Sequence, residues 1–179
     1  ANAILKLDIH AEKDLDKSQI TYGMTSIPLP ESVASTKMKW LRGIFQNGYM
    51  YAIPAWANAI LCVDVDAFWG RRPNADRSDV IKLIPLPDEH PEGMQWQWHG
   101  AGINQEKTAI YCIPSNAQQV LKVDLLTNTS SLLPIEFDEK KYKNFRIDLS
   151  NKFYGGIRGV DNAIYGVPYR APATLRIDC

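Results

Sequence analysis

The sequence predicts an all-β protein built from β-propeller blades, each made of four antiparallel strands. One pattern, a short run with Tyr that ends in Pro and leads to an apolar run that ends in Asp, occurs three times. Its copies cover residues 51–64, 111–124 and 165–178, and residues 1–9 match its second half. The closing aspartates are Asp8, Asp64, Asp124 and Asp178, at intervals of 56, 60 and 54 residues. A long, nearly fixed period indicates repeated units, and four short strands per unit are typical of a propeller blade.

The repeat unit is clearest between residues 95 and 137. Its predicted strands are 95–103, 108–114, 118–125 and 130–137, and the last is broken by Pro134. The first carries aromatic residues and glycines, the second is apolar with Tyr and Ile, and the third alternates apolar and polar residues. Turn-forming residues separate the strands. Helical periodicity is limited to about one turn near residues 10–17.

The outer and inner strands of the unit differ in composition. Proline recurs in the fourth strand, as in 26–30 and 83–87. Because proline cannot donate a ladder hydrogen bond, we expect this strand at the outer edge of each blade. Glycine recurs in the first strand, as in 39–44 and 152–157, and suits an inner strand where neighbouring blades crowd the axis. The spacing between first and second strands varies, so the register of the inner strand stays open.

We interpret residues 1–179 as a single propeller segment. Its blade-equivalents are about 1–36 (partial), 37–94, 95–143 and 144–179 (partial). These supply about three blades, whereas propellers close with four to eight. We therefore expect part of a larger propeller, completed by the remaining blades of the same chain, or by a protein partner such as a second copy in a homo-oligomer. A small atypical array, capped by its own loops, is the third interpretation.

The composition excludes some functional classes. Twenty basic residues balance twenty acidic ones, which argues against a general nucleic-acid binder because such a protein needs a basic surface. The longest apolar stretch, 52–63, contains Pro54 and is too short to cross a bilayer, so we expect no membrane insertion.

The cysteines and histidines predict neither a metal site nor a cofactor. Cys62, Cys112 and Cys179 lack the spacing of zinc or redox motifs, and no His, Asp and Glu set has metal-ligand spacing. We expect buried free thiols in the strands. An odd number of cysteines favours an intracellular, reducing compartment, whereas the glycosylation sequon at Asn128 favours the opposite.

Residues 110–114, 120–124 and 127–129 resemble blades of kelch and YVTN propellers, which share an Ile-Tyr strand, a Val-x-x-x-Asp strand and a Thr-Asn-Thr turn. The Trp-His-Gly run at 98–100, with its Ile-Tyr-x-Ile-Pro strand, is similar to a propeller repeat of single-celled eukaryotes. The resemblance covers nearly the whole chain and implies a propeller fold, but it implies no activity, because propellers carry unrelated functions. The chain departs from kelch where Ile-Pro or Val-Pro replaces the glycine pair and where the late tryptophan is missing.

Residues that recur in every unit are predicted to be structural. The aspartates should accept hydrogen bonds from backbone N–H groups of the following turn, and Tyr51, Tyr111 and Tyr165 should pack between blades. We predict no catalytic residue. The candidates for partner binding do not recur: the insertion loop with Phe68, Trp69, Arg71 and Arg72, then Trp96, Trp98, His99, Tyr169 and Arg170. Arginine and aromatic residues are enriched at interfaces. For His99, a core or channel-lining role is favoured over a catalytic one.

The leading hypothesis is a non-enzymatic propeller that acts as an interaction scaffold within a larger assembly. One alternative is a hydrolase or lyase with an axial site near His99 or Arg158, completed by other blades. The other is a carbohydrate-binding propeller whose exposed aromatic residues stack on sugar rings.

Replacing Trp69 and Arg71 with alanine should weaken capture of a protein partner while leaving the fold intact, because exposed Trp and Arg supply much of the binding energy at interfaces. A pull-down with the double variant measures this. Unchanged capture would refute the assignment of this loop.

Overall fold

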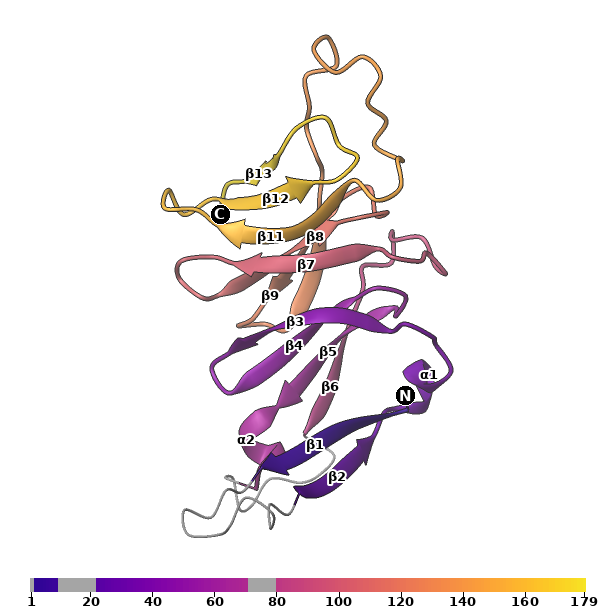
Figure 1. The fold of residues 1–179 in the computed structure, drawn as a ribbon, viewed down its shortest axis with the longest axis vertical. Helices are drawn as coiled ribbons and strands as arrows, with labels where there is room; N and C mark the ends of the chain where they lie inside the picture. Colours follow the sequence, from indigo (N-terminus) through magenta and orange to yellow (C-terminus); the bar gives the residue numbers. More distant parts are fainter. Residues whose placement is uncertain (1, 10–21, 71–79) are drawn as a thin grey trace. The chain divides into compact units, whose positions relative to one another are not determined.

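The computed structural model describes residues 2–9, 22–70 and 80–179 and divides the chain into two compact units, 1–36 and 37–179. In the first unit, strand β1 (Ala3–Ile9) pairs antiparallel with β2 (Tyr22–Pro28), and a helical turn, α1 (Glu31–Ala34), follows (Figure 1). These strands carry the third-strand and fourth-strand patterns of the repeat. Their pairing is therefore the one that the repeat predicts for the outer half of a blade.

The second unit contains three antiparallel sheets over residues 37–70 and 80–179, each with its strands in sequence order (Figure 1). The first blade consists of β3 (Trp40–Gln46), β4 (Tyr49–Pro54), β5 (Ala59–Asp64) and β6 (Ile81–Pro85), with a short helix, α2 (Val65–Phe68), after β5. The second blade consists of β7 (Trp98–Ile103), β8 (Ala109–Pro114), β9 (Val120–Asp124) and β10 (Thr129–Leu133). The third blade consists of β11 (Phe153–Arg158), β12 (Ile164–Pro168) and β13 (Leu175–Ile177). The predicted all-β fold with four-stranded blades is confirmed, and no helix in the described ranges is long and apolar enough to cross a membrane.

Prolines mark the outer edges, as predicted. β6 and β10 are edge strands of their sheets. β10 ends at Leu133, directly before Pro134, where the sequence predicts a break because proline has no N–H for the ladder. The strand does not resume after the proline, although the predicted strand extends to residue 137. The Oγ of Ser130 donates a hydrogen bond to the carbonyl oxygen of Pro85 at 2.6 Å and joins the two outer edges.

A β-bulge fixes the register that the sequence leaves open. The first residue of each inner strand pairs with a proline: Trp40 with Pro54, Trp98 with Pro114 and Phe153 with Pro168. The next regular pair lies three residues later on the inner strand but only two residues earlier on the second strand, as in Gly43 with Ala52. Each inner strand therefore contains one extra residue. The extra turn is made by residues with left-handed backbone: Arg42 (φ 65°), Gly100 (φ 83°) and Gly155 (φ 89°).

Each blade is closed by one carbonyl group that accepts three hydrogen bonds. One carbonyl oxygen, that of the residue before each inner strand, accepts from three successive N–H groups of the turn after the second strand, at 2.8–3.2 Å; these residues are Lys39, Gln97 and Lys152. Neighbouring blades are joined at the same place, because the N–H of Lys152 donates to the carbonyl oxygen of Ser115 at 3.0 Å. We call this end of the blades, with the β4–β5, β8–β9 and β12–β13 turns, the turn end. The opposite end is the hairpin end.

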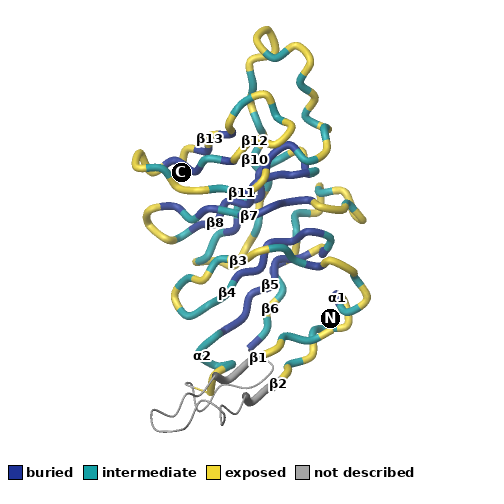
Figure 2. Tube along the Cα trace, in the orientation of Figure 1, coloured by how far each residue is buried: buried dark blue, intermediate teal, exposed yellow. Residues whose placement is uncertain are grey.

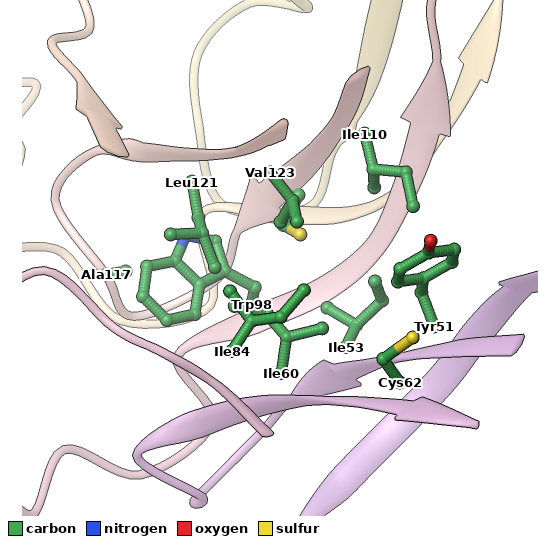
Figure 3. Close-up of a cluster of buried hydrophobic side chains, with 11 residues drawn as sticks. Tyr51, Ile53, Ile60, Cys62, Ile84, Trp98, Ile110, Ala117, Leu121 and Val123 are labelled. Atoms are coloured by element: carbon green, nitrogen blue, oxygen red, sulfur yellow. The ribbon is translucent and has the colours of Figure 1, made fainter. Parts of the chain in front are cut away.

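The core lies between the faces of neighbouring blades (Figure 2). Ile53, Ile60 and Ile84 of the first blade pack against Trp98 and Leu121 of the second (Figure 3). A second cluster joins the second and third blades.

Glycines let the inner strands come close to the neighbouring face. A Cβ atom on Gly102 would lie 2.7 Å from Cγ2 of Ile164, and one on Gly156 would lie 2.6 Å from Cγ1 of Ile113. At the boundary of the second and third blades, each of the two blades therefore inserts an isoleucine where the other has no side chain.

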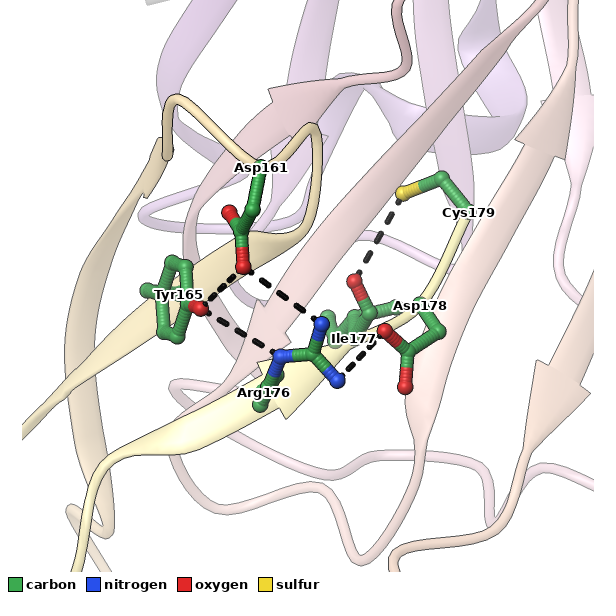
Figure 4. A network of polar contacts seen from close by, with 6 residues as sticks. All are labelled: Asp161, Tyr165, Arg176, Ile177, Asp178 and Cys179. Atoms are coloured by element: carbon green, nitrogen blue, oxygen red, sulfur yellow. Dashed lines mark hydrogen bonds and ion pairs between the residues drawn. The ribbon is translucent and has the colours of Figure 1, made fainter.

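Asp64, Asp124, Tyr51 and Tyr111 have the structural roles expected of them, whereas Tyr165 and Asp178 do not, and the side chain of Asp8 lies outside the described residues. Oδ1 of Asp64 accepts from the N–H of Ala67, and Oδ1 of Asp124 accepts from the N–H groups of Leu126 and Thr127, all at 2.9 Å. Tyr51 and Tyr111 are buried in the two core clusters. The third copy is on the surface, where Tyr165 donates to the carboxylate of Asp161 at 2.6 Å, and Arg176 bonds both of them and Asp178 (Figure 4).

Candidate functional site

Four side chains gather at the turn end of the inner strands, and we call them the axial cluster: Arg42, His99, Tyr154 and Tyr169. His99 and Tyr154 are the second residues of β7 and β11, so the bulge register places them side by side. Their rings stack with centroids 3.5 Å apart and planes 27° apart. The ring of Tyr169, which follows β12, lies 5.8 Å from that of Tyr154. Tyr154 is 50% exposed and Tyr169 67%, so two ring surfaces face solvent.

Arg42 extends across the inner strands of the two following blades. A Cβ atom on Gly155 would lie 3.2 Å from Nη1 of Arg42, and one on Gly100 would lie 3.6 Å from its Cδ. The glycines at the bulges of β7 and β11 thus leave room for the arginine side chain.

The conformation and environment of Arg42 are unusual for a structural residue. Its φ of 65° is one that non-glycine residues adopt at an energetic cost, and the second and third blades have glycine at this position. The residue is exposed, and no hydrogen bond or ion pair joins its guanidinium to any part of the chain that the structure describes. Within the described residues, Arg42 is therefore a cation without an ion-pair partner, on a strained backbone.

His99 is held neutral next to this cation. Burial, and then the charge of Arg42, lower the pKa of His99 below its ordinary value. The side chain is only 6% exposed, and its Nδ1 has no hydrogen-bond partner among the described residues. The ring of His99 stacks on that of Tyr154, which fits the channel-lining role considered from the sequence.

The structure brings together some of the predicted site residues. His99 and Tyr169 meet through Tyr154, and Arg170 is exposed at the same end. Trp96 is also at the turn end, 38% exposed, with its ring edge-on to that of Trp56 at 5.9 Å.

The other candidate residues have places or roles that differ from the prediction, or lie outside the described residues. Trp98 is completely buried, and its Nε1 donates to the carbonyl oxygen of Gln119 at 3.0 Å, so its assignment as a partner-binding residue is wrong.

Phe68 and Trp69 follow β5 at the hairpin end, far along the strands from the axial cluster, with their rings in an edge-on contact at 6.5 Å. Arg71 and Arg72 lie outside the described residues. Arg158, at the hairpin end of β11, donates to the carbonyl oxygen of Asn104 at 3.4 Å and is not near His99.

Sequence reasoning missed Arg42 and the exposed ring of Tyr154. The signal for Arg42 was its alignment with Gly100 and Gly155, which becomes visible only when the bulge register is known. Tyr154 belongs to the next inner strand, so its contact with His99 across the blade boundary becomes visible only in the structure.

The described residues include cysteine thiols but no cluster of metal ligands. No group of three His, Cys, Asp or Glu side chains gathers there in a way that could hold a metal ion. Cys62 and Cys112 are buried free thiols, as expected, and burial raises the pKa of both. The axial cluster offers the Arg42 cation and the exposed rings of Tyr154 and Tyr169, which are groups that can bind a ligand.

Comparison with known proteins identifies the fold. No protein-family model matches the sequence, and no curated protein matches it. A catalytically inactive virginiamycin B lyase from Staphylococcus aureus, solved with quinupristin, is similar in structure, with a TM-score of 0.57 and 12% identity over 98% of this chain and 56% of that chain. A streptogramin B lyase gives a TM-score of 0.56 and 14% identity over the same shares.

The likeness confirms a β-propeller-like fold. At these identities it shows the fold alone, and the kelch or YVTN repeat type stays a prediction. This chain spans a little over half the length of the neighbours.

Proposed function

We propose that this chain is a non-enzymatic β-propeller segment that serves as an interaction scaffold and that its axial cluster binds an acidic segment of a protein partner. The observation that carries the proposal is Arg42, an exposed cation without a partner among the described residues, on a backbone conformation that favours glycine. The other two blades have glycine at this bulge position, so the strained backbone of Arg42 is explained by a role of its side chain that glycine cannot perform.

The aromatic rings define the second half of the proposed contact. A carboxylate of the partner would form a bidentate pair with the Arg42 guanidinium, whose planar fork matches it. An adjacent aromatic side chain of the partner would stack on the exposed rings of Tyr154 and Tyr169, which present large and rigid surfaces. The neutral state of His99 leaves the arginine as the cation of the cluster.

Replacing Arg42 with glycine should abolish binding without harming the fold. The probe is the peptide acetyl-Tyr-Glu-Glu-Tyr-amide, and calorimetry measures its affinity for each variant. We expect Arg42→Gly to weaken binding at least about tenfold, as loss of a charge-assisted pair does. The free energy of unfolding should stay unchanged or rise by up to about 1 kcal/mol, because glycine adopts this φ without strain.

The matched control is Lys107→Gly, which also removes an exposed cation at positive φ (59°) but lies in the β7–β8 hairpin at the hairpin end. It should leave binding unchanged. The neutral peptide acetyl-Tyr-Gln-Gln-Tyr-amide should bind weakly. The proposal would be refuted if both peptides bound with equal affinity, or if wild type and Arg42→Gly bound the acidic peptide equally well. Sugar binding at Tyr154 and Tyr169 that is unchanged in Arg42→Gly would favour the carbohydrate-binding alternative.

A second candidate, an enzyme with an axial site, is favoured by one observation. The neutral imidazole of His99 has an unbonded Nδ1, and a neutral imidazole is the form that acts as a general base. The test substrate is quinupristin, the molecule named with the structural neighbour. Turnover that is lost in His99→Ala but kept in Arg42→Gly would support the enzyme and not the scaffold.

A further inference from the structure

A second site lies at the turn end, in a pocket that none of the sequence patterns indicates. The pocket has a volume of about 250 Å³ and is formed by the β4–β5 turn and by the segment that leads from β6 to β7. The indole of Trp56 and the rings of Pro87 and Pro91 form apolar walls, and Asp88, His90 and Glu92 contribute the ionisable groups. We call it the loop pocket.

The hydrogen bonds around Gln97 determine how His90 faces the loop pocket. The Gln97 side-chain amide donates through Nε2 to the carbonyl oxygen of Ala57 at 3.1 Å, which orients its oxygen, Oε1, toward His90. That oxygen lies 2.7 Å from Nε2 of His90 and can only accept, so Nε2 carries the proton. In the neutral ring, Nδ1 is then an acceptor, and no hydrogen bond within the described ranges engages it.

The charges around the loop pocket are all of one sign. Asp88 and Glu92 are exposed, and neither has an ion-pair partner among the described residues. No lysine or arginine lines the pocket. Burial lowers the pKa of His90, so its ring is neutral at pH 7 and adds no positive charge. The pocket thus presents two carboxylates, one nitrogen acceptor and an aromatic wall.

We propose that the loop pocket binds an alkyl guanidinium or ammonium group, as an arginine or lysine side chain of a protein partner carries. The cation would donate hydrogen bonds to the carboxylates of Asp88 and Glu92 and to Nδ1 of His90. The Trp56 ring offers a surface for cation–π contact, and the proline rings cover the aliphatic stem. This site goes beyond the acidic contact proposed for the axial cluster and does not depend on it.

The test is a titration with N-acetyl-arginine methylamide, followed by NMR at the Trp56 indole and by calorimetry. We expect saturable binding with a dissociation constant on the order of 1 mM, typical of a single small cationic group. The citrulline analogue, which has nearly the same shape but no charge, should bind at least tenfold more weakly. The double variant Asp88→Asn, Glu92→Gln should lose at least tenfold in affinity for the arginine compound.

The control double variant Glu106→Gln, Glu139→Gln removes the same charge from exposed positions outside the pocket and should bind like wild type. Tighter binding of acetyl-Gly-Arg-Gly-amide than of the arginine amide would support a protein source for the cation, and equal binding would support a small amine. Equal binding of citrulline and arginine, or wild-type affinity in the Asp88 and Glu92 variant, would overturn the proposal. Its failure would leave the Arg42 experiment unaffected.

Discussion

Replacing Trp98 with alanine is expected to lower the free energy of unfolding by about 3–5 kcal/mol, the range found when a large aromatic residue is removed from a core. Trp98 is completely buried at the boundary of the first two blades (Figure 3). The centroid of its ring lies 4.7 Å from that of His90. The change leaves a cavity between blades and removes the donor to the carbonyl oxygen of Gln119. Urea unfolding followed by circular dichroism measures the loss.

The matched control is Trp98→Phe. The third blade has Phe153 at this position, so a phenyl ring fits the register, and the change isolates the indole hydrogen bond and part of the ring volume. We expect a loss of about 1–2 kcal/mol. A Trp98→Ala protein as stable as wild type would contradict the packing of these two blades.

Replacing Lys152 with methionine should lower the free energy of unfolding by about 2–4 kcal/mol at pH 7. Lys152 is fully buried, and its Nζ donates to the carbonyl oxygens of Ser115, Asn116 and Leu149 at 3.1, 3.3 and 3.1 Å. Methionine fills a similar volume but leaves the last two carbonyls without this donor. The exposed Lys140→Met variant is the control and should change stability by less than about 0.5 kcal/mol.

The same lysine predicts a pH dependence with a definite sign. Burial lowers the pKa of Lys152 to about 8 from the 10.5 of an exposed lysine. Between these values the unfolded chain holds the proton and the folded chain releases it, so the contribution of Lys152 to stability increases as the pH rises from 8 to 10.5.

The measurement is the difference in unfolding free energy between wild type and Lys152→Met at several pH values. The buried thiols Cys62 and Cys112, whose pKa values are raised, lower stability in this range, but they do so in both proteins and cancel in the difference. A difference that falls as the pH rises from 8 to 10.5 would contradict the lowered pKa of the buried Lys152.

Much of the fold follows from the order of residues along the chain. The position of the edge strands follows from Pro85 and Pro134, because proline lacks the N–H that a central strand must donate. The roles of Asp64 and Asp124 follow from their place at the end of a strand. The register of the inner strands did not follow, because a bulge adds one residue at Arg42, and sequence spacing does not distinguish a bulge from a longer hairpin.

The axial cluster was only partly predictable, since it is made across blade boundaries. His99 and Tyr169 were candidates, but the side chain that joins them belongs to the next inner strand. Tryptophan is common at interfaces, which made Trp98 a candidate, whereas in this repeat its side chain packs against the preceding blade. The loop pocket depends on the orientation of one amide, Gln97, which local sequence does not determine.

The measurement that tests the account most directly is NMR mapping of the acetyl-Tyr-Glu-Glu-Tyr-amide contact on the wild-type protein. The Nε–H resonance of Arg42 and the ring resonances of Tyr154 and Tyr169 should shift in a saturable way, while those of Trp69 at the hairpin end should not. Shifts confined to the hairpin end, or none at saturating peptide, would contradict an acidic partner at the axial cluster.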